Sequence, residues 1–410
     1  MYKVRLYIKI SVSLIAATAL FYIAMRQGLS ALEQRPTDEV SERLAIREAE
    51  KLAIGEHSYG IVEYTHYPNG PQYVLTLMMN AGIREPRALR SAPLVFSALS
   101  IAILGFCVSM VGASVVLSAL GVAGVSALLS QPGVIQWMGA LYGNSYSLAL
   151  CFAGLGLCLL ARGAGWAALV LGFFSGWMGY DFTFCFIGVV VVARLLVVDH
   201  SFDMRSVLKS VFLAGGVASL GVFAAIVTHL TQNALYFGSV KMAFNDLIGS
   251  AAARAGLPIS STLNPEYANF IRSAAIAQGK GQDGEYSRWS ILADLWNSFM
   301  TPEWSNDQPV AVLFYVALAL SGCIFLVGWA RTRSLRFAAV PTLLTIGALA
   351  LSIVFGVAWF VLMPQHARFH FHFIQRQLFV PILLAWICLW HFGNRLRSAM
   401  RDNNDRWYLL

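Results

Sequence analysis

Residues 91–111, which read SAPLVFSALSIAILGFCVSMV, form an apolar run without a charged side chain. A helix needs about 20 mostly apolar residues to cross the hydrocarbon core of a membrane, and this run has that length. The rest of the chain has the same character, because 58% of its 410 residues are hydrophobic, only 12% are charged, and the mean hydropathy is +0.63. Soluble domains carry about 25% charged residues, so the composition predicts an integral membrane protein.

Apolar runs of this kind recur along the whole chain. We therefore predict an all-α polytopic membrane protein, in which residues 1–410 form a single integral membrane domain with about ten transmembrane helices. The predicted spans are 5–25, 91–111, 113–130, 142–161, 164–179, 182–198, 209–230, 309–330, 337–362 and 373–392. The first span begins like a signal peptide, but its apolar stretch is long and it lacks a clear cleavage site, so we expect it to be retained.

About half of the chain's 29 lysine and arginine residues lie in or beside alternate loops of this topology. Cytoplasmic loops are enriched in lysine and arginine, which predicts that both termini are cytoplasmic. The residues concerned are Lys3, Arg5, Lys9, Arg162, Arg194, Arg205, Lys209, Arg331, Arg333, Arg336, Arg395, Arg397, Arg401 and Arg406. The net charge of +8 then reflects topology and attraction to anionic membrane lipids. Because these residues do not form one patch, a nucleic-acid partner has no support.

Two large polar segments, 27–90 and 231–308, fall on the opposite, extracytoplasmic side. In the first, Asp38-Glu39 opens a predicted amphipathic helix on the membrane surface. Its helical stripe is Val40, Leu44, Arg47 and Lys51. A second short helix is predicted at 71–82, after a turn that brings His66 back towards Asp38. The segment 231–308 is either a lid over a substrate cleft or a passive cover.

The order of these features resembles a known family. An Asp-Glu pair opens a surface helix, the proline-rich turn His66-Tyr67-Pro68-Asn69-Gly70-Pro71 follows, and then come Arg84–Pro93 and, at the last span, Gln375–Pro381. This set resembles the GT-C superfamily of membrane glycosyltransferases that use polyprenyl-phosphate sugars, which includes protein O-mannosyltransferases and the lipid A aminoarabinose transferase. The resemblance implies a GT-C-like helix bundle with extracytoplasmic surface helices over a cleft.

The resemblance also implies an activity. A sugar would move from a polyprenyl-phosphate donor to a lipid, glycan or protein acceptor, on the extracytoplasmic face of what we expect to be a bacterial inner membrane. The sequence lacks a glycine-rich phosphate-binding loop, in agreement with a donor that is not a nucleotide. The rival classes are a secondary transporter, a non-catalytic envelope-assembly protein, and an O-antigen ligase or polymerase.

Three groups of site residues follow from the resemblance. Asp38 matches the family's acid, with Glu39 beside it, and would deprotonate or orient the acceptor hydroxyl, or else only complement a helix N-terminus. Arg376 matches the family's basic residue and would bind the donor phosphate, or else anchor its helix at the interface. His66 and Tyr67 would face that phosphate, or else lie in a solvated loop.

Five further residues are candidate substrate or metal contacts. His370 and His372 could join His57 or His66 at a divalent metal ion, or belong to a belt of interfacial side chains, so no cofactor is assigned with certainty. Asn144 stands where relatives carry a second acid, which puts metal assistance in doubt. Asp181, a carboxylate at the predicted outside membrane edge, either takes the role of that acid or caps a helix.

Overall fold

The computed structural model describes residues 2–32, 39–55, 68–112, 114–129, 134, 138–141, 144–161, 165–197, 204–255, 292–293, 335–364 and 379–407. The described residues are helical apart from short turns and contain no strand. The helices are α1 (Tyr2–Leu32), α2 (Glu39–Ala53), α3 (Gly70–Asn80), α4 (Pro86–Leu89), α5 (Ser91–Val111), α6 (Val115–Leu129), α8 (Asn144–Leu160), α9 (Gly165–Met178), α10 (Thr183–Val197), α11 (Met204–Phe237), α12 (Val240–Arg254), α16 (Leu335–Leu362) and α19 (Phe379–Trp407).

The apolar runs predicted as spans form helices over most of the parts that the structure describes, and the run 309–330 lies outside the described residues. Among the described residues, four helical stretches are long and apolar enough to cross a membrane, namely Leu6–Ser30, Pro86–Val111, Arg205–Phe237 and Leu344–Leu362. The shorter apolar helices are Val115–Ala127, Ser145–Leu160, Gly165–Met178, Thr183–Val197 and Phe379–Asn394. The chain is thus an all-helical, membrane-embedded protein in the part that the structure describes.

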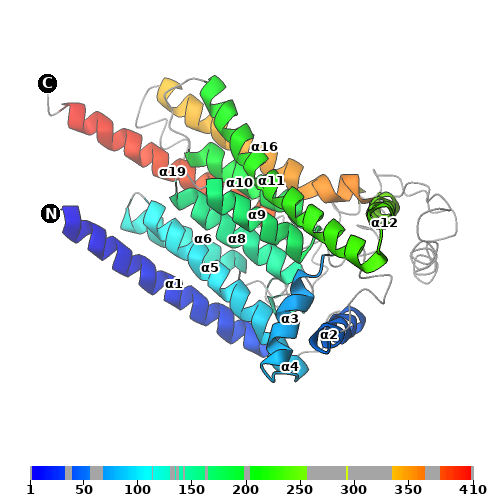
Figure 1. The fold of residues 1–410 in the computed structure, drawn as a ribbon. Helices are drawn as coiled ribbons and strands as arrows, with labels where there is room; N and C mark the ends of the chain where they lie inside the picture. Colours follow the sequence, from blue (N-terminus) through cyan, green and yellow to red (C-terminus); the bar gives the residue numbers. More distant parts are fainter. Residues whose placement is uncertain are drawn as a thin grey trace.

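The long helices form a bundle whose two ends differ (Figure 1). The start of α1 and the end of α19 lie at one end of the bundle, whereas α2, α3, α4 and α12 gather at the other. Within the bundle α1 packs on α5, α5 on α8, α9 on α11, and α16 on α10 and α19.

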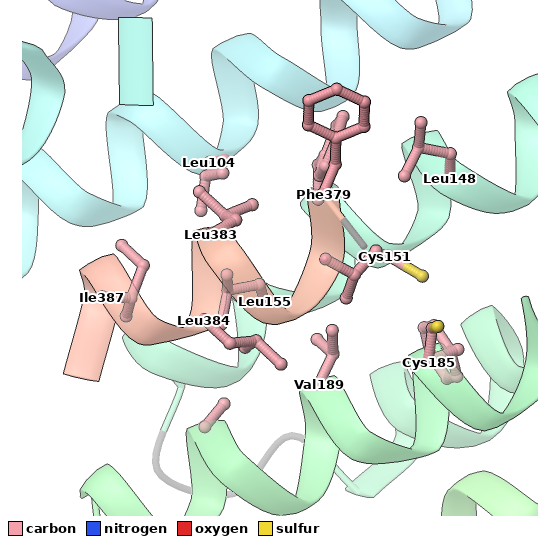
Figure 2. Close-up of a cluster of buried hydrophobic side chains, with 14 of the residues drawn as sticks. Leu104, Leu148, Cys151, Leu155, Cys185, Val189, Phe379, Leu383, Leu384 and Ile387 are labelled. Carbon is pink, nitrogen blue, oxygen red and sulfur yellow. The ribbon is translucent and has the colours of Figure 1, made fainter. Parts of the chain in front are cut away.

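The bundle core is formed by apolar side chains from helices far apart in the sequence. Figure 2 shows α5, α8, α10 and α19 converging on one cluster. Its labelled members are Leu104, Leu148, Cys151, Leu155, Cys185, Val189, Phe379, Leu383, Leu384 and Ile387. Lipid is as apolar as these side chains, so close packing rather than transfer out of water has to hold such helices together.

Glycine residues allow close contact between the backbones of α9 and α11. A Cβ atom on Gly172 would lie 2.6 Å from the backbone oxygen of Ala218, and one on Gly221 would collide with the backbone oxygen of Leu169. Small residues allow membrane helices to approach to backbone contact. The two backbones therefore touch where these glycines face each other's helices.

At the far end of the bundle, α2, α3 and α4 pack together into what we call the α2–α4 unit. The face of α2 that is buried in this unit consists of Glu42, Ala45, Glu48 and Ala49. The residues whose spacing predicted this helix lie outside its buried face, since Arg47 is exposed and Leu44 is only half-buried. The physical reason is that the small alanines let α2 approach Leu75 and Met79 of α3 closely.

Candidate functional site

Only part of the predicted site lies among the described residues. The predicted site residues that lie outside the described residues are Asp38, His57, His66, Tyr67, His370, His372 and Arg376. Glu39 is the first residue of α2, and Asn144 is the first residue of α8. Asp181 lies in the turn between α9 and α10 and is only 6% exposed. The Asp181 carboxylate is therefore buried within the protein.

An ion pair connects the α2–α4 unit to the bundle. The Nε and Nη2 atoms of Arg90 donate to Oε2 of Glu42 at 2.9 and 2.5 Å. The two side chains are 11% and 6% exposed, so the pair is largely withdrawn from water. Arg90 sits between α4 and α5. The pair therefore holds the first turns of α2, which begins at Glu39, against the start of a bundle helix.

A small apolar core completes the α2–α4 unit. Its members are Ala45, Ala49, Leu75, Met79, Leu89 and Leu141. The Thr76 hydroxyl also lies 3.2 Å from the backbone oxygen of Ala49 and 2.8 Å from that of Gln72, and it can donate to either oxygen. Since Leu141 shortly precedes α8, this core brings the helix that starts at Asn144 to the same end of the bundle as α2.

The start of α3 rests on the end of α9. A Cβ atom on Gly70 would lie 2.6 Å from the backbone oxygen of Trp177, so only glycine fits there without a shift. The Tyr73 ring stacks on the Trp177 ring with centroids 5.8 Å apart and planes at 25°. Asp181 follows shortly after the end of α9. The α2–α4 unit therefore lies directly beside the turn that carries this carboxylate.

A buried polar network extends from that turn into α11. The Tyr180 hydroxyl lies 2.6 Å from Nδ1 of His229, and Nε2 of His229 lies 3.3 Å from Nδ2 of Asn233. If the Asn233 amide donates to Nε2, the ring proton is on Nδ1 and is donated to the Tyr180 oxygen. The Tyr180 O–H is then available to donate to another group.

Arg254 of α12 interacts electrostatically with Tyr180 of the same network. Burial raises the pKa of the Tyr180 hydroxyl, and the positive charge of Arg254 opposes that rise. Arg254 is 3% exposed, and Asp246, earlier on α12, is 6% exposed. Buried charges are costly unless they are paired, so their presence at this end marks it as the polar end of the bundle.

This network and the Glu42–Arg90 pair are absent from the set of residues predicted from the sequence. A usable signal was present, because His229, Gln232 and Asn233 recur at i, i+3 and i+4 near the end of an otherwise apolar helix. The predicted span ends at 230, whereas α11 continues to Phe237. The predicted boundary at 230 places His229 in a span but Gln232 and Asn233 in a loop. The three residues were therefore not recognised as one face of a single helix.

The described residues contain no group of three or more His, Cys, Asp or Glu side chains arranged to hold a metal ion. The histidines predicted as metal ligands lie outside that part of the chain. What the described site offers instead is a set of hydrogen-bonding and charged groups, from α2, α3, α11, α12 and the α9–α10 turn, beneath a short helical layer. No family model, curated protein or solved structure matches the chain.

Proposed function

We propose that this protein is a membrane glycosyltransferase with a ten-span, GT-C-like arrangement. It would transfer a sugar from a polyprenyl-phosphate donor to a lipid, glycan or protein acceptor on the extracytoplasmic face of a bacterial inner membrane. The observation that carries the proposal is a set of buried polar groups, among them Asp181, His229 and Arg254, at the end of the bundle where the α2–α4 unit packs, opposite the start of α1 and the end of α19. With cytoplasmic termini, that end is extracytoplasmic.

The location suits a lipid-linked donor. Its polyprenyl tail would lie in the bilayer beside the apolar helices, and its phosphate would lie at the depth where those helices end. Polar and charged groups in a membrane protein are expensive and are retained mainly where they bind or react. The α2–α4 unit is attached by the Glu42–Arg90 pair, which supports a layer that stays in place over this end.

The chemistry needs few groups. Asp38 takes the proton of the acceptor hydroxyl as its oxygen forms a bond to the anomeric carbon. The bond between that carbon and the phosphate oxygen breaks, and polyprenyl phosphate leaves with the bonding electrons. Arg376, with its two-bond grip, and His66 and Tyr67 stabilise the negative charge on the leaving phosphate. Glu39 stands beside Asp38 and is the second candidate acid.

The test uses the full-length protein in nanodiscs with a panel of polyprenyl-phosphate sugars and extracted envelope acceptors. We expect Asp38→Asn to lower turnover by about 10²–10⁴-fold, the usual contribution of a general base. The matched control is Glu50→Gln, which removes a carboxylate from the exposed face of α2. Transfer at normal rates by Asp38→Asn, or no transfer with any donor of the panel, would contradict the proposal.

Arg376 provides a second, graded test. Lysine keeps the charge but loses the planar fork, so Arg376→Lys should retain partial activity and Arg376→Ala much less. Equal activity of wild type and both variants would leave Arg376 as an interfacial anchor.

A secondary transporter is the second candidate, and one observation favours it. His229 is fully buried in the stretch Arg205–Phe237, which is apolar enough to cross a membrane. Ionisable residues inside such helices often belong to ion or proton pathways. Uptake of a labelled solute into proteoliposomes, lost in His229→Gln and without sugar transfer, would favour the transporter over the glycosyltransferase.

A further inference from the structure

Four polar atoms at the junction of α3, α8, α9 and α11 are buried without a hydrogen-bond partner in the described structure. They are Oε1 of Gln72, the hydroxyl of Tyr146, Nε1 of Trp177 and Oε1 of Gln232. Gln72 is 4% exposed and Tyr146 is 2% exposed. About 90% or more of buried polar atoms in proteins have a partner, so four together call for something that binds them.

Contacts connect three of these residues through one group of side chains, and the fourth, Gln72, is the neighbour of that group in the chain. Trp177 stacks on Tyr73, the residue that follows Gln72 on α3. The Gln232 amide nitrogen reaches the Tyr73 hydroxyl at 3.5 Å. Tyr146 belongs to a small buried cluster with Met178, against which Trp177 also packs. Trp177, Gln232 and Tyr146 thus belong to one connected group of side chains that includes Tyr73.

Their chemistry defines the class of ligand. The two glutamine oxygens accept hydrogen bonds, the indole N–H donates one, and the tyrosine hydroxyl does either. None of the four groups carries a charge, so a phosphate or a metal ion is a poor match. A sugar ring is a good match, because it has hydroxyls that donate and accept around its edge and an apolar C–H face that can lie against an aromatic ring. Binding sites commonly combine aromatic walls with a few placed polar groups.

We propose that this junction binds a sugar ring, and that under the proposed function the ring is the one carried by the polyprenyl-phosphate donor. The position agrees with this role. Trp177 is the penultimate residue of α9, and Tyr73 lies in the first turn of α3. The site therefore lies where the bundle meets the α2–α4 unit, within reach of a headgroup whose lipid tail lies alongside the bundle.

The first experiment measures binding without turnover. Full-length protein in nanodiscs is titrated with methyl α-D-mannopyranoside, methyl β-D-glucopyranoside and methyl β-L-arabinopyranoside, and with farnesyl phosphate as a sugar-free lipid phosphate, using saturation-transfer NMR. Two variants remove one partner each: Trp177→Phe keeps a stacked ring without the N–H, and Gln232→Met keeps the length without the amide. Trp166→Phe, on the same helix at a position 80% exposed, is the matched control.

We expect at least one glycoside to bind. Each of the two variants should weaken that binding about five- to tenfold, the range of one lost hydrogen bond. Farnesyl phosphate binding and the behaviour of Trp166→Phe should be unchanged. No binding of any glycoside, or equal binding by wild type and both variants, would overturn the sugar site.

The second experiment separates this inference from the proposed function. With an active donor, the variants should raise the KM for the donor more than they lower kcat, whereas a rise in the KM for a glycan acceptor alone would assign the site to the acceptor sugar. Normal transfer with unchanged KM values would remove the site and leave the glycosyltransferase standing. Absence of any transfer, together with glycoside binding that depends on Trp177 and Gln232, would remove the glycosyltransferase and leave a sugar-binding site.

Discussion

The bundle and the α2–α4 unit are held together by different forces. The bundle core contains large apolar side chains that are almost completely buried, such as Phe152 and Phe186. The core of the unit is small, and its buried face of α2 carries two glutamates, Glu42 at 4% and Glu48 at 0% exposure. Shape complementarity therefore holds the membrane part, whereas charge pairing holds the layer above it.

The difference follows from the surroundings of each region. In lipid there is little gain from burying one apolar side chain against another, so helices associate through close contact. At the end of the bundle, an ion pair withdrawn from water is strong only while both partners are present. The two regions should therefore respond to different substitutions.

The largest effect is expected at the ion pair of the α2–α4 unit. Glu42→Gln leaves the largely buried charge of Arg90 without its carboxylate, which commonly costs about 3–5 kcal/mol. We expect α2 and α3 to open, with fast hydrogen exchange and proteolysis there, while the bundle helices keep their protection. Glu50→Gln, on the exposed face of α2, is the control and should change nothing. Unchanged exchange in α2 of Glu42→Gln would mean that apolar contacts alone hold the unit.

The second-largest effect is expected in the bundle, and the substitution should not change hydrogen exchange in the α2–α4 unit. In Gly221→Ala the new methyl group meets the backbone of α9, so the helices must separate, and overpacking of this kind costs about 1–3 kcal/mol. The loss of stability is measured as the decrease in the free energy of unfolding in detergent micelles.

Gly216, on the same helix, is the matched control for the change in unfolding free energy. A Cβ atom added there would have no atom within 4 Å apart from its own stretch of helix. Gly216→Ala should be neutral or stabilising by up to about 1 kcal/mol, because alanine favours helix over glycine. Equal stability of the two alanine variants would show that α9 and α11 do not touch at Gly221.

A third effect lies where the two regions meet. Tyr180→Phe removes the hydroxyl that lies 2.6 Å from Nδ1 of His229, and losing one partner of a buried hydrogen bond costs about 1–3 kcal/mol. The expected result is a lower melting temperature in nanodiscs. Tyr22→Phe, at a position 64% exposed on α1, is the matched control. A melting temperature equal to wild type would show that the Tyr180–His229 contact adds nothing to stability.

The smallest effect is again confined to the α2–α4 unit. Thr76→Val keeps the side-chain shape but removes a hydroxyl that joins α3 to the backbone of α2, worth about 1 kcal/mol. Slightly faster exchange in α2 is expected. Thr228→Val, where the hydroxyl only bonds its own exposed helix, should behave as wild type. An effect at Thr228 as large as at Thr76 would refute the assignment of the Thr76 bond to the contact between α2 and α3.

The helices themselves were largely predictable. The run 91–111 is α5, the run 164–179 contains α9, and the short helix expected at 71–82 is α3 at Gly70–Asn80. The signal is local, because apolar composition and turn residues act within a few positions. The site was harder to predict, since Arg90 lies 48 residues from Glu42, and His229 lies 49 residues from Tyr180. Asp181 could be singled out as a carboxylate near a helix end, but not as a buried one.

Composition and apolar run length were enough to establish an all-helical, membrane-embedded protein. In lipid the backbone N–H and C=O groups of a spanning segment must form hydrogen bonds within that segment, so a long apolar run forms a helix. The packed structure was needed to show which face of α2 is buried, and that Trp177 and Gln232 both contact Tyr73 of α3. The reason is that helix rotation and crossing depend on how side chains from distant segments fit together, and no local pattern in the chain encodes that fit.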